Sequence, residues 1–221
     1  MKTAAMVRFS HSKRLLEMWL KYYSRYFDDL YVFACELEGY DVYDEMGGLD
    51  KKYKFEIIGS DKIYSVQAHQ AVFDKQEELL RDHEWVIYTD IDEFVIPSSK
   101  YKDLREFMEN TKRKQAFCMG YEVFMGEGEN LIDYGKPPIL KQRKYWYRDI
   151  TGTYNKPVLS RIKSDWSVGF HKLLDMSDED VKKIDRTGLY MVHLKHIDNN
   201  EILKENKDLK RRIPHMVRSL I

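Results

Sequence analysis

The sequence predicts an α/β domain in which a mixed sheet is flanked by helices. In its first half, short apolar stretches alternate with amphipathic stretches of helical length, which is the pattern of βαβ units. Residues 85–88 form a near-continuous apolar run, typical of a central strand buried on both faces. The chain has 221 residues, of which 43% are hydrophobic, and no linker rich in Pro, Gly or Ser divides it. We therefore expect one domain with one core.

The first half contains four expected strands and two expected helices. The strands are residues 4–9, 30–34, 55–58 and 85–91. The first helix, at 12–27, has Leu16, Trp19 and Tyr23 on one stripe, and the second helix occupies 65–81. Strands separated by helices of this length predict parallel, right-handed βαβ units.

The second half has a different character. Its expected strands are residues 116–125, 139–147, 156–162 and 189–194, and loops rather than crossover helices separate them. A charged helix is expected at 200–212, ending before Pro214. Such a half can form the second wall of a cleft against the first.

Three carboxylates follow the apolar run directly: Asp90, Asp92 and Glu93. Charged side chains at the end of a core strand require a partner, and residues two apart in a strand point to the same face. Asp90 and Asp92 are thus expected to converge on a hard cation, Mg²⁺ or Mn²⁺, beside a phosphate. Ligands bind outside the carboxyl ends of strands in open α/β sheets, which supports this interpretation over that of a chance pair of solvated acids.

The overall composition excludes some classes of partner. The chain has 37 basic and 37 acidic residues, so no net field favours nucleic acid or an anionic membrane. The cysteines, Cys35 and Cys118, lie in apolar segments and are expected as buried free thiols. We expect no signal peptide and no membrane span, because no apolar stretch is long enough. A cytoplasmic location is expected, or the host cytoplasm if the chain is viral.

Several blocks of the sequence resemble, in order, those of nucleotide-sugar glycosyltransferases of the GT-A fold, in particular family-2-like enzymes with an Asp-x-Asp motif. The blocks are residues 6–8, 16–20, 27–32, 90–92, 139–143, 156–159, 166–171 and 189–196. This family also has members in large algal viruses. The resemblance implies a GT-A, Rossmann-like mixed sheet over residues 1–221. Residues 1–98 would approximately form the nucleotide-sugar-binding half, and residues 99–221 the acceptor half that completes the active site.

The resemblance also implies an activity and its ligands. It implies metal-dependent transfer of a hexose or deoxyhexose from a UDP-sugar to a glycan, a glycoprotein or another hydroxyl acceptor, with Mn²⁺ or Mg²⁺. Asp92 would be the main metal ligand, with Asp90 reaching the ion directly or through water. His193 would complete the metal site, and Lys195 and His196 would face the diphosphate. The ordinary alternative for His193 is a histidine of the core or rim with a backbone partner.

The donor nucleotide is expected at the end of the first strand. Val7, Arg8 and Phe9 would form a wall for the uracil ring, and Gln67 and Gln70 would project from the helix before the fourth strand. Ile91, between the two aspartates, belongs to the same nucleotide-binding stretch. Arg8 could equally be a surface charge.

The expected catalytic residues are Glu127, Asp92 and His171. Glu127 lies in the loop at 125–129, whose glycines let the backbone approach a sugar closely, and an inverting enzyme would use it as the base. Other carboxylates of the same region are Glu122, Glu129 and Asp133. His171 is the competing metal ligand, or it contacts the acceptor or the donor sugar.

Two other classes of protein stay open on sequence alone. A nucleotidyltransferase or metal-dependent phosphohydrolase also uses aspartates at strand ends, but it normally has a glycine-rich phosphate loop or further metal-binding acids. A degenerate, non-catalytic domain that binds sugar nucleotides or carbohydrate is the third possibility.

Overall fold

A single nine-stranded sheet organises the part of the chain that the computed structural model describes, which is residues 1–136, 138–148, 156–177 and 188–198. The strands are β1 (Thr3–Phe9), β2 (Asp29–Cys35), β3 (Glu56–Ser60), β4 (Trp85–Thr89), β5 (Glu93–Pro97), β6 (Gln115–Phe124), β7 (Tyr145–Arg148), β8 (Pro157–Ser160) and β9 (Leu189–His196). Their order is β3-β2-β1-β4-β8-β6-β9-β5, and β7 pairs with β6.

The two halves of the sheet differ in strand direction. Strands β3, β2, β1 and β4 are parallel, as the βαβ pattern predicts. Strand β8 is antiparallel to both of its neighbours, β4 and β6. Strand β9 runs parallel to β6, and β5 runs antiparallel to β9. A parallel half continued by mixed strands agrees with a GT-A, Rossmann-like sheet, so the predicted fold class is confirmed.

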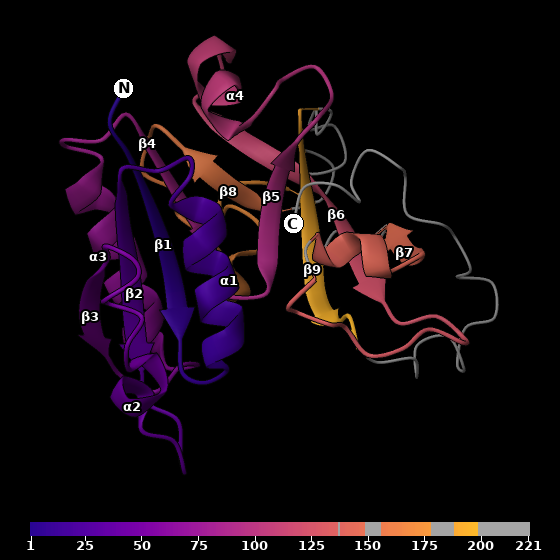
Figure 1. Ribbon diagram of the computed structural model, residues 1–221. Helices are drawn as coiled ribbons and strands as arrows, with labels where there is room; N and C mark the ends of the chain where they lie inside the picture. Colours follow the sequence, from indigo (N-terminus) through magenta and orange to yellow (C-terminus); the bar gives the residue numbers. More distant parts are fainter. Residues whose placement is uncertain (137, 149–155, 178–187, 199–221) are drawn as a thin grey trace.

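Helices cover both faces of the parallel half (Figure 1). The two that do so are α1 (Lys13–Tyr23) and α3 (Val66–Leu79). The other described helices are α2 (Val42–Met46) and α4 (Leu104–Asn110), with short 3-10 helices at Ile139–Gln142 and Val168–Phe170. Alternate residues of β1 explain the two layers. Ala5 and Val7 pack in the cluster that contains α1, whereas Ala4 and Met6 pack in the cluster that contains α3. The core therefore consists of two layers separated by the sheet.

Several predicted boundaries change. The strand predicted at 85–91 ends at Thr89, so the aspartates lie in the turn to β5. The single strand predicted at 139–147 is a 3-10 helix followed by β7, because the buried Arg143 side chain bonds carbonyls of other segments instead of extending a ladder. Strand β5 and helices α2 and α4 were not predicted. The helix predicted at 200–212 lies outside the described residues.

Candidate active site

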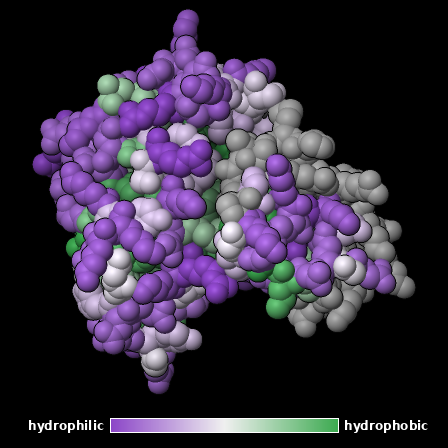
Figure 2. Space-filling model, in the orientation of Figure 1, coloured by the Kyte–Doolittle hydropathy of each residue, from purple (hydrophilic) through white to green (hydrophobic). Residues whose placement is uncertain are grey.

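A cleft of about 1140 Å³ opens where the carboxyl ends of several strands meet. The ends of β1 and β9 lie at the same edge of the molecule (Figure 1), and β4, whose end leads into the turn to β5, lies between these two strands in the sheet order. The lining includes Arg8, Ser10, His11, His69, Asp90, Ile91, Asp92, Glu93, Lys156, His171, His193 and Lys195. Hydrophilic side chains predominate on the face shown in Figure 2, with smaller hydrophobic groups between them.

The turn between β4 and β5 sets the position of the acids. The backbone N–H of Asp90 donates to Glu93 Oε2 at 3.0 Å, and the N–H of Glu93 donates to the carbonyl of Asp90 at 3.1 Å. Helix α1 holds both ends of the turn, because the indole of Trp19 donates to Thr89 Oγ1 at 2.8 Å and the hydroxyl of Tyr23 donates to the Glu93 carbonyl at 3.1 Å. The convergence of the acids is thus a property of a tight turn and not of strand alternation.

His193 lies between two carboxylates. Its Nδ1 is 2.6 Å from Glu122 Oε2 and its Nε2 is 3.3 Å from Asp92 Oδ2. Burial disfavours the charged imidazole, but the hydrogen bonds to Asp92 and Glu122 outweigh burial and raise the pKa of His193 to about 10. In this arrangement Glu122 fixes the ring, and the face with Nε2 and Asp92 is turned to the cleft.

Lys156 lies between the other two carboxylates of the turn. Its Nζ is 2.8 Å from Asp90 Oδ2 and 2.6 Å from Glu93 Oε1, and its side chain is only 2% exposed. Burial opposes the charge on Lys156, but the two carboxylates outweigh it and raise the pKa of the ammonium above its usual value. Burial likewise opposes ionisation of Asp90, yet Lys156 and Arg8 hold the pKa of Asp90 below its usual value. For Glu93, burial prevails and the pKa is raised.

Arg8 is a buried guanidinium on the floor of the cleft. Its Nε donates to the hydroxyl of Tyr88 at 2.7 Å, and one Nη donates to the Ile63 carbonyl at 2.8 Å. The other Nη is 3.6 Å from Asp90 Oδ1, which also accepts the Tyr88 hydroxyl at 3.0 Å. The guanidinium lies 5.0 Å from the centre of the Phe170 ring, a cation–π contact. Arg8 is therefore a structural cation of the site and not a surface charge.

The segment around Phe170 brings His171 to the cleft through an unusual backbone. Gly169 and Phe170 both have positive φ, 80° and 61°. A Cβ at Gly169 would lie 2.6 Å from His171 Nε2, so only glycine lets this ring lie against the backbone. Phe170 is a strained non-glycine residue, and its ring stacks on His69 with centroids 5.1 Å apart.

The donor set of the cleft fits one divalent cation with two protein ligands. Among the described residues no group of three or more His, Cys, Asp and Glu side chains is arranged to hold a metal ion. However, Asp92 Oδ2 and His193 Nε2 are 3.3 Å apart, and adjacent ligands of an octahedral ion are about 3 Å apart. A carboxylate behind the metal-facing histidine, as Glu122 provides, is the usual support of such a ligand. Mg²⁺ is commonly bound by one or two side chains together with substrate phosphates and water.

A second cavity of about 1070 Å³ adjoins the cleft and shares Ile63 and Tyr64 with it. Its walls include Tyr40 and Tyr43 at the carboxyl end of β2. Tyr40 is 52% exposed and Tyr64 is 83% exposed, so flat aromatic surface is available there for a ring-shaped ligand.

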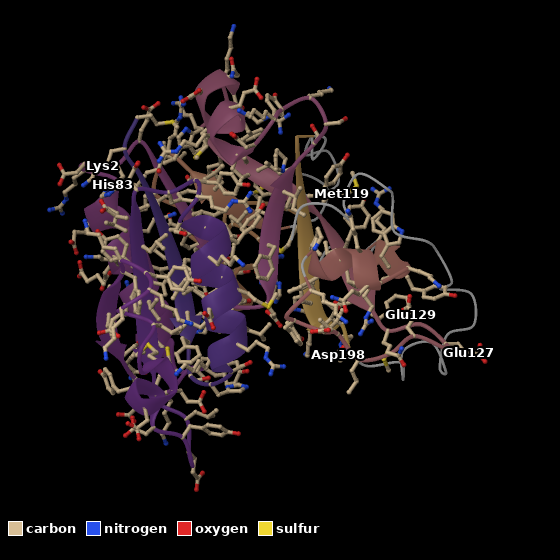
Figure 3. All side chains as sticks on the ribbon, viewed as in Figure 1. Lys2, His83, Met119, Glu127, Glu129 and Asp198 are labelled. Atoms are coloured by element: carbon tan, nitrogen blue, oxygen red, sulfur yellow. The ribbon has the colours of Figure 1, made fainter. Side chains whose placement is uncertain are left out.

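The structure brings together only part of the predicted set. Of the predicted residues, Arg8, Asp90, Ile91, Asp92, His171, His193 and Lys195 line the cleft. Val7 and Phe9 are fully buried in the core cluster that contains α1. Gln67 and Gln70 are exposed on α3, and His196 and Glu127 are not among the residues that line the cleft. Glu127 lies at the tip of the loop after β6, away from Asp198 of the cleft (Figure 3).

Lys156 was not singled out by sequence reasoning, and Glu122 was only one of several acids. A signal for Lys156 was present, since a lone lysine directly before the apolar strand β8 needs a buried partner if it is not at the surface. A signal for Glu122 was its position inside the otherwise apolar β6. Neither signal identifies the partner, which is 66 residues away for Lys156 and 71 residues away for Glu122.

The fold and the cleft define a mixed α/β protein with a Rossmann-like sheet. No protein-family model and no curated protein sequence matches the chain. Among solved structures, the chain is similar to residues 1–349 of TarS, a glycosyltransferase of S. aureus, with 14% identity and a TM-score of 0.37. The alignment covers 73% of this chain and 47% of the TarS chain, so the chain spans about half the length of that structure. A likeness of this size carries no information about activity.

None of the helices in the described ranges combines the length and the apolar character needed to cross a membrane.

Proposed function

We propose that this protein is a metal-dependent glycosyltransferase that moves a hexose or deoxyhexose from a UDP-sugar to a hydroxyl group of a glycan or another acceptor. The observation that carries the proposal is the convergence of Asp92 Oδ2 and His193 Nε2, 3.3 Å apart, at the carboxyl edge of a Rossmann-like sheet. Glu122 supports the histidine from behind at 2.6 Å. This edge is where open α/β sheets bind phosphorylated ligands.

Asp92 and His193 would hold Mn²⁺ or Mg²⁺. When bound, such an ion stabilises the negative charge that develops on the departing diphosphate. Glu122 keeps the Nδ1 proton of His193, so Nε2 is the atom that becomes available once its own proton has left. Lys195, exposed at the rim of the cleft, is a further cation for the diphosphate.

The nucleoside would occupy the side of the cleft toward β2. The adjoining cavity offers the rings of Tyr40 and Tyr64 for stacking against a base, and Glu36 and Asp41 as acceptors for hydroxyl groups. This places the nucleoside above the end of β2, beyond the wall that was predicted from β1 alone. Arg8 would act on the nucleotide only indirectly, as part of the floor of the cleft, because its donors already bind Tyr88, Ile63 and Asp90.

The acceptor side would be formed by the second half of the chain. His171 lines the cleft and is a candidate to contact the acceptor or the transferred sugar. Glu127 remains the proposed base for an inverting reaction. In this structure Glu127 is exposed and does not line the cleft, so its loop would have to approach the cleft when the acceptor binds.

A UDP-sugar panel with Mn²⁺ tests the proposal. Thermal shift should show stabilisation by UDP and UDP-sugars that depends on the metal, because a ligand that binds only the folded state raises its apparent stability. Mass spectrometry should show UDP release together with transfer to an added acceptor or to water. Asp92→Asn should abolish both signals, and Asp50→Asn, at an exposed position outside both cavities, should not.

One result would reject this function, and another would reject the assigned metal site. Cleavage of the diphosphate, with UMP and a sugar phosphate as products, would instead indicate a phosphohydrolase. Full transfer activity in Asp92→Asn would remove the assigned metal site.

A further inference from the structure

A buried lysine divides the acid cluster of the turn between β4 and β5. Asp90, Asp92 and Glu93 follow one another within this turn. Lys156 reaches it from the start of β8 and contacts Asp90 and Glu93 at 2.8 and 2.6 Å. Asp92 has a different partner, His193, at 3.3 Å. The cluster therefore consists of an ammonium-bound pair and a separate Asp92–His193 pair.

Lys156 has little opportunity to act on a substrate directly. Its side chain is 2% exposed, and its ammonium already contacts two carboxylates. An ammonium that is paired with two carboxylates is no nucleophile. Any influence of Lys156 on the reaction is thus exerted through the carboxylates that it holds.

We propose that Lys156 is a positioning residue that keeps Asp90 and Glu93 out of the coordination of the divalent ion, so that Asp92 and His193 are its only ligands from the described protein. The inference rests on the proposed metal-dependent function. Both carboxylate oxygens of Asp90 already have protein partners, because Oδ2 accepts from Lys156 and Oδ1 accepts the Tyr88 hydroxyl at 3.0 Å. Asp90 thus belongs to one polar network with Lys156, Tyr88 and Arg8.

The consequence is that the protein needs the nucleotide diphosphate to bind the ion well. Two protein ligands leave most positions of an octahedral ion to phosphate oxygens and water. Without the contacts of Lys156, the carboxylates of Asp90, Asp92 and Glu93 would together bind a hard cation in the absence of nucleotide. Lys156 therefore couples metal binding to donor binding, because it pairs with the carboxylates of Asp90 and Glu93, which would otherwise bind the ion without nucleotide.

Manganese binding, measured by electron paramagnetic resonance with and without UDP, tests the inference independently of activity. The wild-type protein should bind Mn²⁺ weakly alone and at least roughly tenfold more tightly with UDP. Lys156→Met should gain at least roughly tenfold in nucleotide-free Mn²⁺ affinity, and adding Asp90→Asn to it should remove the gain. Lys163→Met is the matched control, because Lys163 is half-exposed and pairs with Glu77 at the surface at 2.9 Å.

The aspartate variants keep the inference testable if Lys156→Met does not fold. With UDP present, Asp90→Asn should bind Mn²⁺ within about threefold of wild type, whereas Asp92→Asn should lose at least roughly tenfold. Equal losses in the two variants, or no gain in a folded Lys156→Met, would overturn the role of Lys156 and leave the proposed function in place. No Mn²⁺ binding by wild type even with UDP would overturn both.

Discussion

Replacing Glu122 by glutamine should lower the pKa of His193. Both side chains are 7% exposed, and the 2.6 Å contact between Glu122 Oε2 and His193 Nδ1 is a charge-assisted hydrogen bond in the metal-free protein. Glutamine has nearly the same shape and can still accept a hydrogen bond, but it has no charge. The perturbation therefore removes one of the two carboxylates that stabilise the imidazolium and leaves Asp92 in place.

The magnitude follows from the difference between two kinds of hydrogen bond. Bonds to charged groups contribute about 1.5–3 kcal/mol and neutral ones about 0.5–1.5 kcal/mol, so the substitution should remove about 1–1.5 kcal/mol of preference for the imidazolium. One pKa unit corresponds to about 1.4 kcal/mol. The pKa of His193, about 10 in the wild-type protein, should therefore fall by roughly one unit.

The assay is NMR of protein with ¹⁵N-labelled histidine, titrated with EDTA present. Metal affinity at neutral pH is the poorer measurement for this purpose. Glu122 supports the metal-facing imidazole, but it also stabilises the proton that the metal must displace, so the two effects oppose each other. The ring nitrogens report the protonation step alone, and they also identify which nitrogen keeps its proton.

Glu127→Gln is the matched control, because it makes the same chemical change in the exposed loop that follows the same strand. It should leave the titration of His193 unchanged. A Glu122→Gln protein that is folded and whose His193 titrates as in wild type would refute the reasoning. So would loss of the Nδ1 proton before the Nε2 proton in wild type, because it would show that Glu122 does not fix the ring.

Three further predictions concern stability and the reaction. The pKa of His193 is raised to about 10, so its stabilising contribution should be complete below about pH 6.5 and be lost as the pH rises to about 10. Urea unfolding of metal-free protein should show a decrease on the order of a few kcal/mol that is absent from His193→Gln. Arg143→Met should cost about 3 kcal/mol of unfolding free energy, because it leaves Asp198 without its buried cation, whereas Lys144→Met at the surface should cost little. Glu127→Gln should abolish transfer if Glu127 is the base, and proton NMR of the first product should show an inverted anomer; undiminished transfer would reject that role.

The first half of the fold was predictable because its signals are local. The apolar run of β1 and the helical stripe of α1 each depend on residues within one element, and parallel order follows from the lengths between them. The second half was less predictable. There the segment at Ile139–Gln142 is shaped by Arg143, whose partners Asn130 and Asp198 lie in other segments. No periodicity within the segment encodes such a contact.

In the candidate site, too, residues with a local signal were predictable and their distant partners were not. Asp90 and Asp92 were found from their position after an apolar strand, because a charge at the end of a core strand must be paired. His193 was found because residues 189–196 resemble a block of a known family. The expected strand geometry at Asp90 and Asp92 was wrong, since the strand ends at Thr89, two residues before the predicted end, and a turn holds the two aspartates near each other. The partners Glu122 and Lys156 could not be assigned, because a single sequence contains no information on which distant charge meets which.

The site depends on contacts from both halves of the chain. Trp19 and Tyr23 of α1 fix the turn from the first half through its backbone and Thr89. Lys156 and His193 fix its side chains from the second half. Asp92 directly precedes Glu93, which is paired with His193 across β5 and β9, so this strand pairing brings Asp92 beside His193.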